Sequence, residues 1–142
     1  MATQYFDGDD IARYGVNGAA LAGIPSQDIT DVCLAVSEEA DAAFRSRYNL
    51  PLLDWGTDVR SQCARIAAYE LLVVRGFNPE LAADQNLLAR ADAARAWLRG
   101  VARQEMQPNV TASPPQVPAY DEPRITTSRR IWPGGCARFP RG

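Results

Sequence analysis

The sequence predicts an all-α protein, and three observations support this prediction. Within residues 1–105, apolar side chains recur at spacings of three and four positions, which is the period of an amphipathic helix. No convincing alternation of apolar and polar residues, as in half-buried strands, occurs there. Seven of the ten prolines fall in residues 106–142 instead. We therefore expect a small bundle of about four helices in residues 1–105, followed by a long, extended, proline-rich arm in residues 106–142.

The first two predicted helices lie before Pro51. A short helix is expected at about residues 9–14, because the acids of DGDD favour a helix start and Gly15 favours a helix end. A long helix is expected over residues 27–48, ending at Asn49 and Pro51 because the residue before a proline avoids the helical conformation. One stripe of this helix is apolar, formed by Ile29, Val32, Val36, Ala40, Ala43 and Phe44.

The other two predicted helices follow Pro51. The third is expected from Thr57, as a cap, to Gly76. It contains the segment Leu71, Leu72, Val73 and Val74, which is apolar almost all round and suits the middle of a bundle or a contact with a neighbouring subunit. The fourth is expected to open on Asn78-Pro79-Glu80, a pattern typical of helix starts, with Gly100 weakening or ending it. Its apolar stripe comprises Leu81, Leu87 or Leu88, Ala91, Ala94, Leu98 and Val101.

The composition argues against an enzyme. The chain has no histidine, which is the commonest general base and metal ligand at neutral pH. All fifteen positive charges are arginines, so neither a Schiff-base lysine nor a phosphate-loop lysine is available. The pairs Asp9/Asp10 and Glu38/Glu39 are sequence neighbours, which point about 100° apart on a helix and do not share a site. We expect no catalytic residue and no cofactor.

The cysteines do not suggest a metal site or a disulfide framework. Cys33, Cys63 and Cys136 are odd in number and widely spaced, and no Cys/His spacing typical of metal ligands occurs. Cys33 and Cys63 fall on helical faces that look buried, where a thiol usually acts as a small apolar filler.

No segment resembles a membrane span or a leader. No apolar run approaches the roughly 18 residues that a transmembrane helix needs. The opening MATQYFDGDD lacks the basic start and apolar stretch of a signal peptide. We therefore expect a protein that is made in a cytoplasm and has no membrane partner.

The arm differs from the rest of the chain in charge. Residues 1–105 hold ten Arg against fifteen acids, a net charge of −5, whereas residues 106–142 hold five Arg against two acids, a net charge of +3. Arginines alternate there with large apolar side chains, as in protein-interface hot spots. The residues expected to bind a partner protein are Arg124, Arg129, Arg130, Ile131, Trp132 and Phe139.

Two other interpretations of the arm remain open. Arginines interleaved with aromatic rings also suit nucleic-acid phosphates and bases, so a DNA-associated protein is the alternative function. A frayed tail without a role is the simplest interpretation.

Three segments of the helical part resemble the head–tail adaptor (connector) proteins of tailed bacteriophages, in the Mu-like prophage head-completion group. They are YFDGDDIARYG near the start, EEADAAFRSRYNLPL at residues 38–52, and the pair VRSQCARIAAYELL and ARADAARAWLRGVAR. Together they cover about residues 4–105. The stretch GAALAGIP and the long arm depart from the family pattern.

The resemblance implies a structural virion protein without catalytic activity, located in the neck at the head–tail interface. Such adaptors assemble as a ring, usually of twelve copies, beneath the portal protein. The ring extends the channel through which genomic DNA passes without sequence-specific binding, and it offers a platform for the tail or its terminator protein. On this model, Leu71–Val74 would pack against neighbouring subunits and the arm would bind the portal or an adjacent copy.

Overall fold

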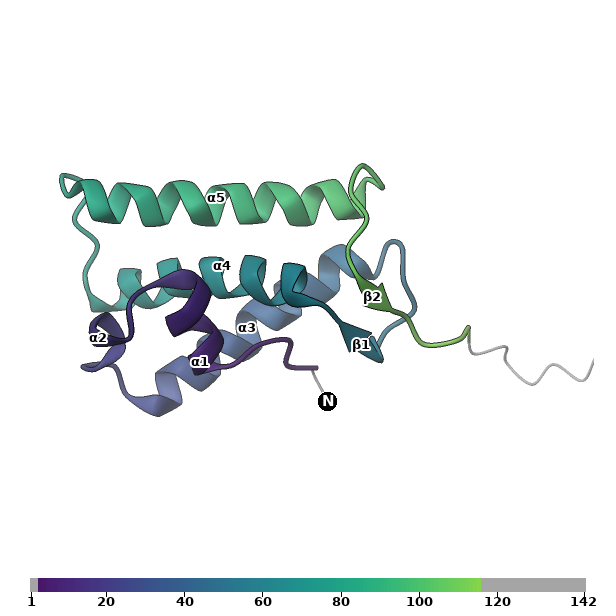
Figure 1. The fold of residues 1–142 in the computed structure, drawn as a ribbon, viewed down its shortest axis with the longest axis horizontal. Helices are drawn as coiled ribbons and strands as arrows, with labels where there is room; N and C mark the ends of the chain where they lie inside the picture. Colours follow the sequence, from purple (N-terminus) through teal and green to yellow (C-terminus); the bar gives the residue numbers. More distant parts are fainter. Residues whose placement is uncertain (1–2, 116–142) are drawn as a thin grey trace, which may run out of the picture.

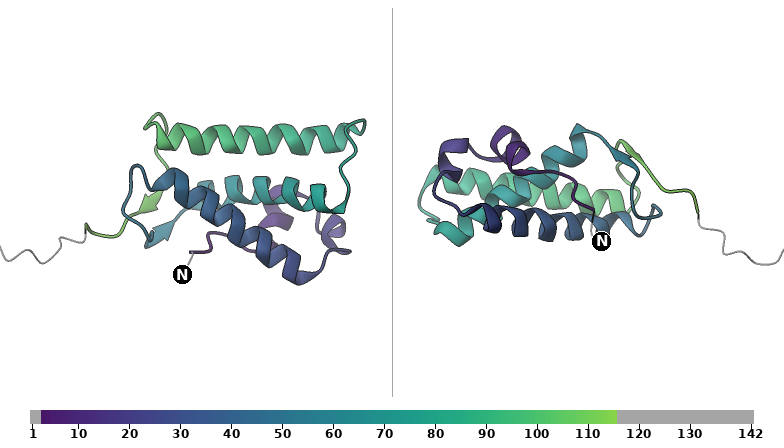
Figure 2. Two further views of the ribbon diagram at one scale, coloured as in Figure 1. Left: turned by 180° about the vertical axis from the view of Figure 1, so that it is seen from behind. Right: turned by 90° about the horizontal axis from the view of Figure 1, so that it is seen from below.

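Helix α4 lies at the centre of the structure and is covered by other helices along its length (Figure 1). The computed structural model describes residues 3–115. Helix α5 runs alongside α4, helix α3 crosses it on another side, and the short N-terminal helices cover a third side (Figures 1 and 2). In chain order the elements are α1 (Gly8–Asp10), the π-helix η1 (Ile11–Gly15), α2 (Gly18–Leu21), α3 (Ser26–Phe44), β1 (Asp54–Trp55), α4 (Thr57–Arg75), α5 (Ala82–Ala102) and β2 (Val110–Thr111).

The predicted all-α class is confirmed, with one small addition. Strands β1 and β2 form a two-stranded antiparallel sheet, in which Asp54 lies opposite Thr111 and Trp55 opposite Val110. Each strand has only two residues, which is too short for an alternating pattern to be recognised in the sequence.

The helix boundaries agree in part with the prediction. The first predicted helix is present as α1 followed by η1, and α4 matches within one residue, although Gly56 rather than Thr57 is its cap. Helix α3 ends at Phe44, four residues before its predicted end, and residues 45–47 form a turn in which the amides of Arg47 and Tyr48 both donate to the Phe44 carbonyl. Helix α2 lies outside the four predicted helices, in the GAALAGIP stretch.

The predicted start of the fourth helix was wrong. Helix α5 begins at Ala82, because Asn78 and Glu80 form a turn in which the Asn78 side chain accepts the Glu80 amide. The carboxylate of Asp84 accepts the Asn78 amide and so fastens this turn to the first turn of α5. Gly100 does not end the helix; it is buried within α5, and its carbonyl accepts the amides of residues 105 and 106.

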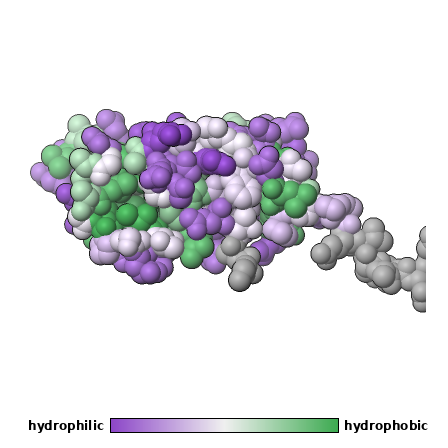
Figure 3. All heavy atoms as spheres, turned by 60° about the horizontal axis from the view of Figure 1, so that its bottom comes forward, coloured by the Kyte–Doolittle hydropathy of each residue, from purple (hydrophilic) through white to green (hydrophobic). Residues whose placement is uncertain are grey.

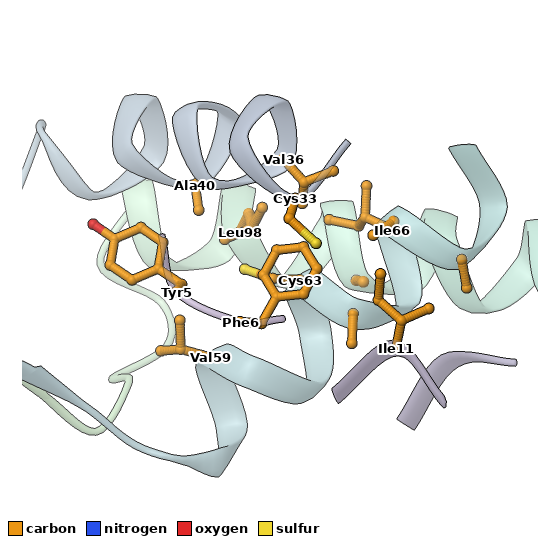
Figure 4. Close-up of a cluster of buried hydrophobic side chains, with 14 of the residues drawn as sticks. Tyr5, Phe6, Ile11, Cys33, Val36, Ala40, Val59, Cys63, Ile66 and Leu98 are labelled. Atoms are coloured by element: carbon orange, nitrogen blue, oxygen red, sulfur yellow. The ribbon is translucent and has the colours of Figure 1, made fainter. Parts of the chain in front are cut away.

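Small side chains fill much of the core. On α4 the buried face includes Ala64, Ala67 and Ala68, and on α5 it includes Ala91 and Ala94. The larger buried groups come both from α4 itself, such as Ile66, and from the segments around it (Figure 4). Those segments contribute Tyr5, Phe6, Ile11 and Val36. The predicted stripe of α3 faces this core, as do Ala91, Ala94, Leu98 and Val101 of α5. Leu81 is 54% exposed, and Leu87 and Leu88 are half-buried outside the core.

Gly15 lets η1 lie directly on α4. A Cβ atom at this position would stand 2.7 Å from the Ala68 Cβ and 2.8 Å from the Ala64 carbonyl oxygen. Both distances are shorter than real contacts allow, and backbone atoms of a packed helix do not give way easily. Glycine is therefore required at this position because η1 and α4 approach each other closely, and not because of its backbone conformation.

The substitution Gly15→Ala should destabilise the fold by about 1–3 kcal/mol, because the added methyl group overpacks the contact between η1 and α4. Urea unfolding followed by circular dichroism measures this change. Gly23→Ala is the matched control, since a Cβ there meets nothing within 4 Å. Equal stability of the two variants would contradict the contact described.

Candidate docking surface and arm attachment

The first residues of the predicted arm are bound to the helical body. Residues 106–113, here called the arm root, lie against residues 45–58 and include the buried Pro108. Backbone bonds of 2.8 Å run from the Leu53 amide to the Thr111 carbonyl and from the Gly56 amide to the Asn109 carbonyl. The path of the chain out of the body is therefore set by the fold up to Ser113.

Side chains from the body hold the arm root at both ends. The Asp58 carboxylate accepts the Asn109 amide over 2.8 Å, and the Arg47 guanidinium donates to the Met106 carbonyl over 2.8 Å. At the outer end, the Ser113 hydroxyl donates to the Pro51 carbonyl. Two of these contacts involve ions, and such hydrogen bonds are stronger than neutral ones.

The Arg-Tyr-x-Leu-Pro-Leu stretch of the resemblance, residues 47–52, forms the loop that receives the arm root. The Arg47 guanidinium lies 5.3 Å from the centre of the Tyr48 ring, and this ring meets Phe44 edge to face at 6.3 Å. Leu52 is buried in the core. The motif thus joins the end of α3, the core and the arm root in one structure.

The opening segment supports the same region from the other side. Tyr5 is buried, and its carbonyl accepts the Trp55 indole N–H over 2.7 Å, while the two rings meet edge to face at 4.9 Å. The Tyr5 hydroxyl donates to the Asp41 carboxylate. Burial and this acidic partner raise the pKa of Tyr5 above its ordinary value. Trp55, the residue of β1 that pairs with the arm root, is thereby fixed to the core.

Acidic and basic side chains near the core have structural partners. The Arg95 guanidinium of α5 contacts Glu39 of α3 over 3.1 Å and Glu70 of α4 over 2.5 Å, so one side chain joins three helices. Asp7 and Asp10 form a reciprocal capping box at the start of α1. Within residues 3–115, no group of His, Cys, Asp and Glu side chains is arranged to hold a metal ion.

The two described cysteines are packed in the core, as their helical positions predicted. Cys33 is 1% exposed and Cys63 is fully buried. Burial, with nearby carboxylates as a smaller cause, raises the pKa of Cys33 to about 11 and that of Cys63 to about 12. The thiolate, which is the nucleophilic form, is therefore scarce at neutral pH.

The predicted partner-binding residues of the arm, Arg124, Arg129, Arg130, Ile131, Trp132 and Phe139, lie outside the described residues. The predicted inter-subunit segment is described, and its members differ. Leu71 is 1% exposed and belongs to the core, Leu72 is half-buried, and Val73 and Val74 are 46% and 67% exposed.

A further apolar surface joins α2 to the last turns of α4. The α2–α4 surface, as we call it, is formed by Val16, Ala20, Leu21, Ile24, Leu72 and the stem of Arg75. The Arg75 guanidinium donates to the Ala20 carbonyl over 2.6 Å and so fixes α2 against α4. Figure 3 shows apolar side chains gathered at this end of the molecule. Sequence reasoning missed the surface because GAALAGIP was not expected to form a helix, although its apolar content was visible.

The negative charge of the body is concentrated on α3. Five acids and no basic residue lie in this helix, namely Asp28, Asp31, Glu38, Glu39 and Asp41. Three of the five, Asp31, Glu38 and Glu39, are exposed. The charged side chains of α3 are thus all acidic, although Glu39 is paired with Arg95, whereas α4 and α5 carry both signs.

A comparison with protein-family models finds one match, described as Bacteriophage Mu, Gp36, over residues 9–127. This range runs from the second residue of α1 through β2 into the arm, so the match includes both the receiving loop and the arm root. No curated protein and no solved structure matches the chain. Among the helices of residues 3–115, none has the length and apolar content that a membrane crossing requires.

The arm root should loosen when its charged anchor is removed. Asp58→Ala deletes the acceptor of the Asn109 amide, which should cost about 1–2 kcal/mol locally. Trypsin cleavage after Arg103 should then become about 5–30 times faster, while the helical circular dichroism is retained. Mass spectrometry follows the cleavage, with the exposed Asp92→Ala on α5 as control. Cleavage at the control rate would contradict an anchoring role for Asp58.

Cys33 and Cys63 should resist alkylation in the folded protein. With pKa values of about 11 and 12, at most about a thousandth of either thiol is ionised at pH 8, and burial also denies the reagent access. Iodoacetamide should modify both residues only after urea unfolding, as read by peptide mass spectrometry. Rapid modification of Cys63 in buffer would show that the core is open.

Proposed function

Because the chain belongs to the bacteriophage Mu Gp36 family, we propose that this phage structural or morphogenesis protein is a head–tail adaptor of the virion neck. In this role copies of the chain form a ring, of twelve subunits as in similar adaptors, beneath the portal protein. The ring extends the DNA channel and provides the attachment platform for the tail or its terminator protein.

The observation that carries the proposal is the attachment of the arm root. An adaptor has to bind a partner at a distance while its own fold stays intact. Here the arm root is bound by Asp58, Arg47 and the sheet, and 27 residues follow the last described position, Pro115. Those residues include the basic and aromatic segment Arg129–Trp132, whose residue types are common hot spots of interfaces. The proposed binding segment therefore follows a part of the chain whose position on the body is fixed by hydrogen bonds.

The charge of α3 supports the channel part of the proposal. A channel wall along which DNA slides must not bind the DNA phosphates. Acidic side chains on that wall repel the phosphates, because both carry negative charge. Helix α3 carries five acids without a basic residue, so we propose that it faces the channel. Helices α4 and α5 each carry five charged residues, of both signs, and suit contacts with protein instead.

We also propose that the protein acts without catalysis. Within residues 3–115 the thiols are buried, and Glu39 and Glu70 are occupied by Arg95. These groups serve the packing of the helices.

Removal of the arm tests the proposal. Deletion of residues 124–142 should leave the helical circular dichroism of the body unchanged and abolish attachment to filled heads. The double variant Ile131→Ala, Trp132→Ala should weaken binding to purified portal by at least about 30-fold, the equivalent of one hot spot of about 2 kcal/mol. Thr126→Ala, Thr127→Ala is the matched control in the same segment.

The alternative DNA-binding role predicts the opposite pattern. If the arm bound DNA phosphates, the affinity for duplex DNA would fall steeply between low and moderate salt concentration. Binding to the portal would then not depend on Trp132. Normal completion of heads by the truncated chain would refute the adaptor proposal.

A further inference from the structure

We propose that two surfaces at opposite ends of α5 bind each other between adjacent copies of this chain. The first, called the α5-start surface, lies at the turn between α4 and α5 and is formed by Val73, Val74, Glu80, Leu81 and Asp84. The second, called the arginine surface, lies where α3 and α5 end and is formed by Arg45, Arg99, Arg103 and Met106. The inference rests on the proposed function, since it names the contact between neighbours in the ring.

Exposed apolar side chains mark both surfaces. Within residues 3–115 five large apolar side chains are exposed, and four of them lie on these two surfaces, namely Val73, Val74, Leu81 and Met106. The fifth, Leu53, lies in the loop before β1. Val73 and Val74 belong to the last turn of α4 and Leu81 directly precedes α5, so the three lie around one short connection. A group of this kind, unlike a single exposed leucine, is typical of an interaction site.

The arginine surface is assembled by contacts between residues far apart in the sequence. The Ser46 hydroxyl donates to the Ala102 carbonyl over 3.3 Å, which joins the ends of α3 and α5. Ser46 and Ala102 are each next in sequence to an arginine of the surface. The Arg47 guanidinium donates to the Met106 carbonyl over 2.8 Å, and the Met106 side chain lies over Gly100 of α5. The position of the surface is therefore set by the fold.

The three arginines of this surface are available to a partner. Each is exposed, and among residues 3–115 the salt bridges are formed by Arg95 alone. Three arginines against the neighbouring Glu105 leave the surface a net charge of +2. Arginine near the end of a helix also interacts favourably with the last carbonyls, but this does not account for the exposed Met106 beside them. Arginine and methionine are both enriched at protein interfaces.

The α5-start surface carries acidic groups instead. Glu80 is exposed there, and the Asp84 carboxylate uses one oxygen to accept the Asn78 amide. The nearby Arg75 is turned toward α2, where its guanidinium donates to the Ala20 carbonyl over 2.6 Å. One surface thus combines apolar and acidic groups, and the other combines an apolar group with arginines. This complementarity within a single chain favours a second copy as the partner of each surface.

The two surfaces cannot meet within one chain. Helix α5 separates them, and with 21 residues it is about 31 Å long and runs straight from one to the other (Figures 1 and 2). A contact between them therefore joins two copies. Because the surfaces differ, the contact is head-to-tail, and it closes into a ring when the rotation between copies permits.

Photo-crosslinking of the full chain tests the contact. Benzoylphenylalanine replaces Leu81 in unlabelled copies, which are mixed with isotope-labelled unmodified copies and irradiated at high protein concentration and low salt. The crosslinked peptides should join unlabelled residue 81 to labelled residues 45–47 or 99–106. Crosslinks confined to one chain, crosslinks to other surfaces of the second copy, or no crosslink would overturn the proposal.

The same photoreactive group at Leu53 is the matched control for its position. Leu53 is 62% exposed, comparable to Leu81, but lies on neither surface. Mixed crosslinks to residues 99–106 should therefore be absent from this variant. An equal yield from position 53 would overturn the proposal, because it would show that Met106 captures the reagent without a specific contact.

A charge exchange separates this contact from general stickiness. Arg103→Glu in the labelled copy should lower the yield of mixed crosslinks from position 81 at least about fivefold, and Glu80→Arg in the unlabelled copy should do the same. The two variants mixed together should recover most of the yield, because the opposite charges face each other again. Arg13→Glu, at an exposed arginine of η1, is the matched control and should leave the yield unchanged.

Circular dichroism checks that each variant folds. Failure of the paired variants to recover the yield would overturn the pairing of the two surfaces. Loss of portal binding on arm deletion is a separate readout, so the contact between copies and the adaptor role can fail independently.

Discussion

The close approach of backbones on α4 is the constraint on which the rest of the structure depends. Ala64 and Ala68 leave room for η1 to lie on α4 at Gly15, and other alanines of α4 and α5 face the same core. Arg90 of α5 reaches across this contact and donates to the carbonyls of Tyr14 and Gly15 over 2.6 and 3.0 Å. Larger side chains would separate the helices and break these bonds. The core of this 142-residue chain therefore depends on close fit more than on the bulk of its side chains.

The arm attachment and the α2–α4 surface are built on the two ends of the same helix. Just before α4 begins, β1 pairs with β2, and Asp58 in its first turn holds the Asn109 amide. Near its end, Leu72 and Arg75 form the α2–α4 surface with α2. Because α4 is one continuous helix packed against α3, α5 and η1, the two features keep a constant separation.

Sequence reasoning recovered the long helices because their apolar spacing is regular over many residues. It failed where one tertiary contact decides the structure. The strands have two residues each and exist because the arm root meets the loop after α3, which no local pattern reveals. The start of α5 was misplaced because Asp84 caps a turn at Asn78 that looks like a helix start. Leu71–Val74 was correctly seen as apolar, but only the packing assigns Leu71 to the core and Val74 to the surface.

The two-stranded sheet also has a mechanical consequence. A pull on the arm acts first on Ser113 and β2, and β2 passes the load to β1 and the loop before α4 through backbone bonds that lie side by side. Several bonds must then give way together, whereas a single flexible linker would simply stretch. Tension on the arm therefore reaches the first turn of α4, the central helix, rather than being lost at the edge of the subunit.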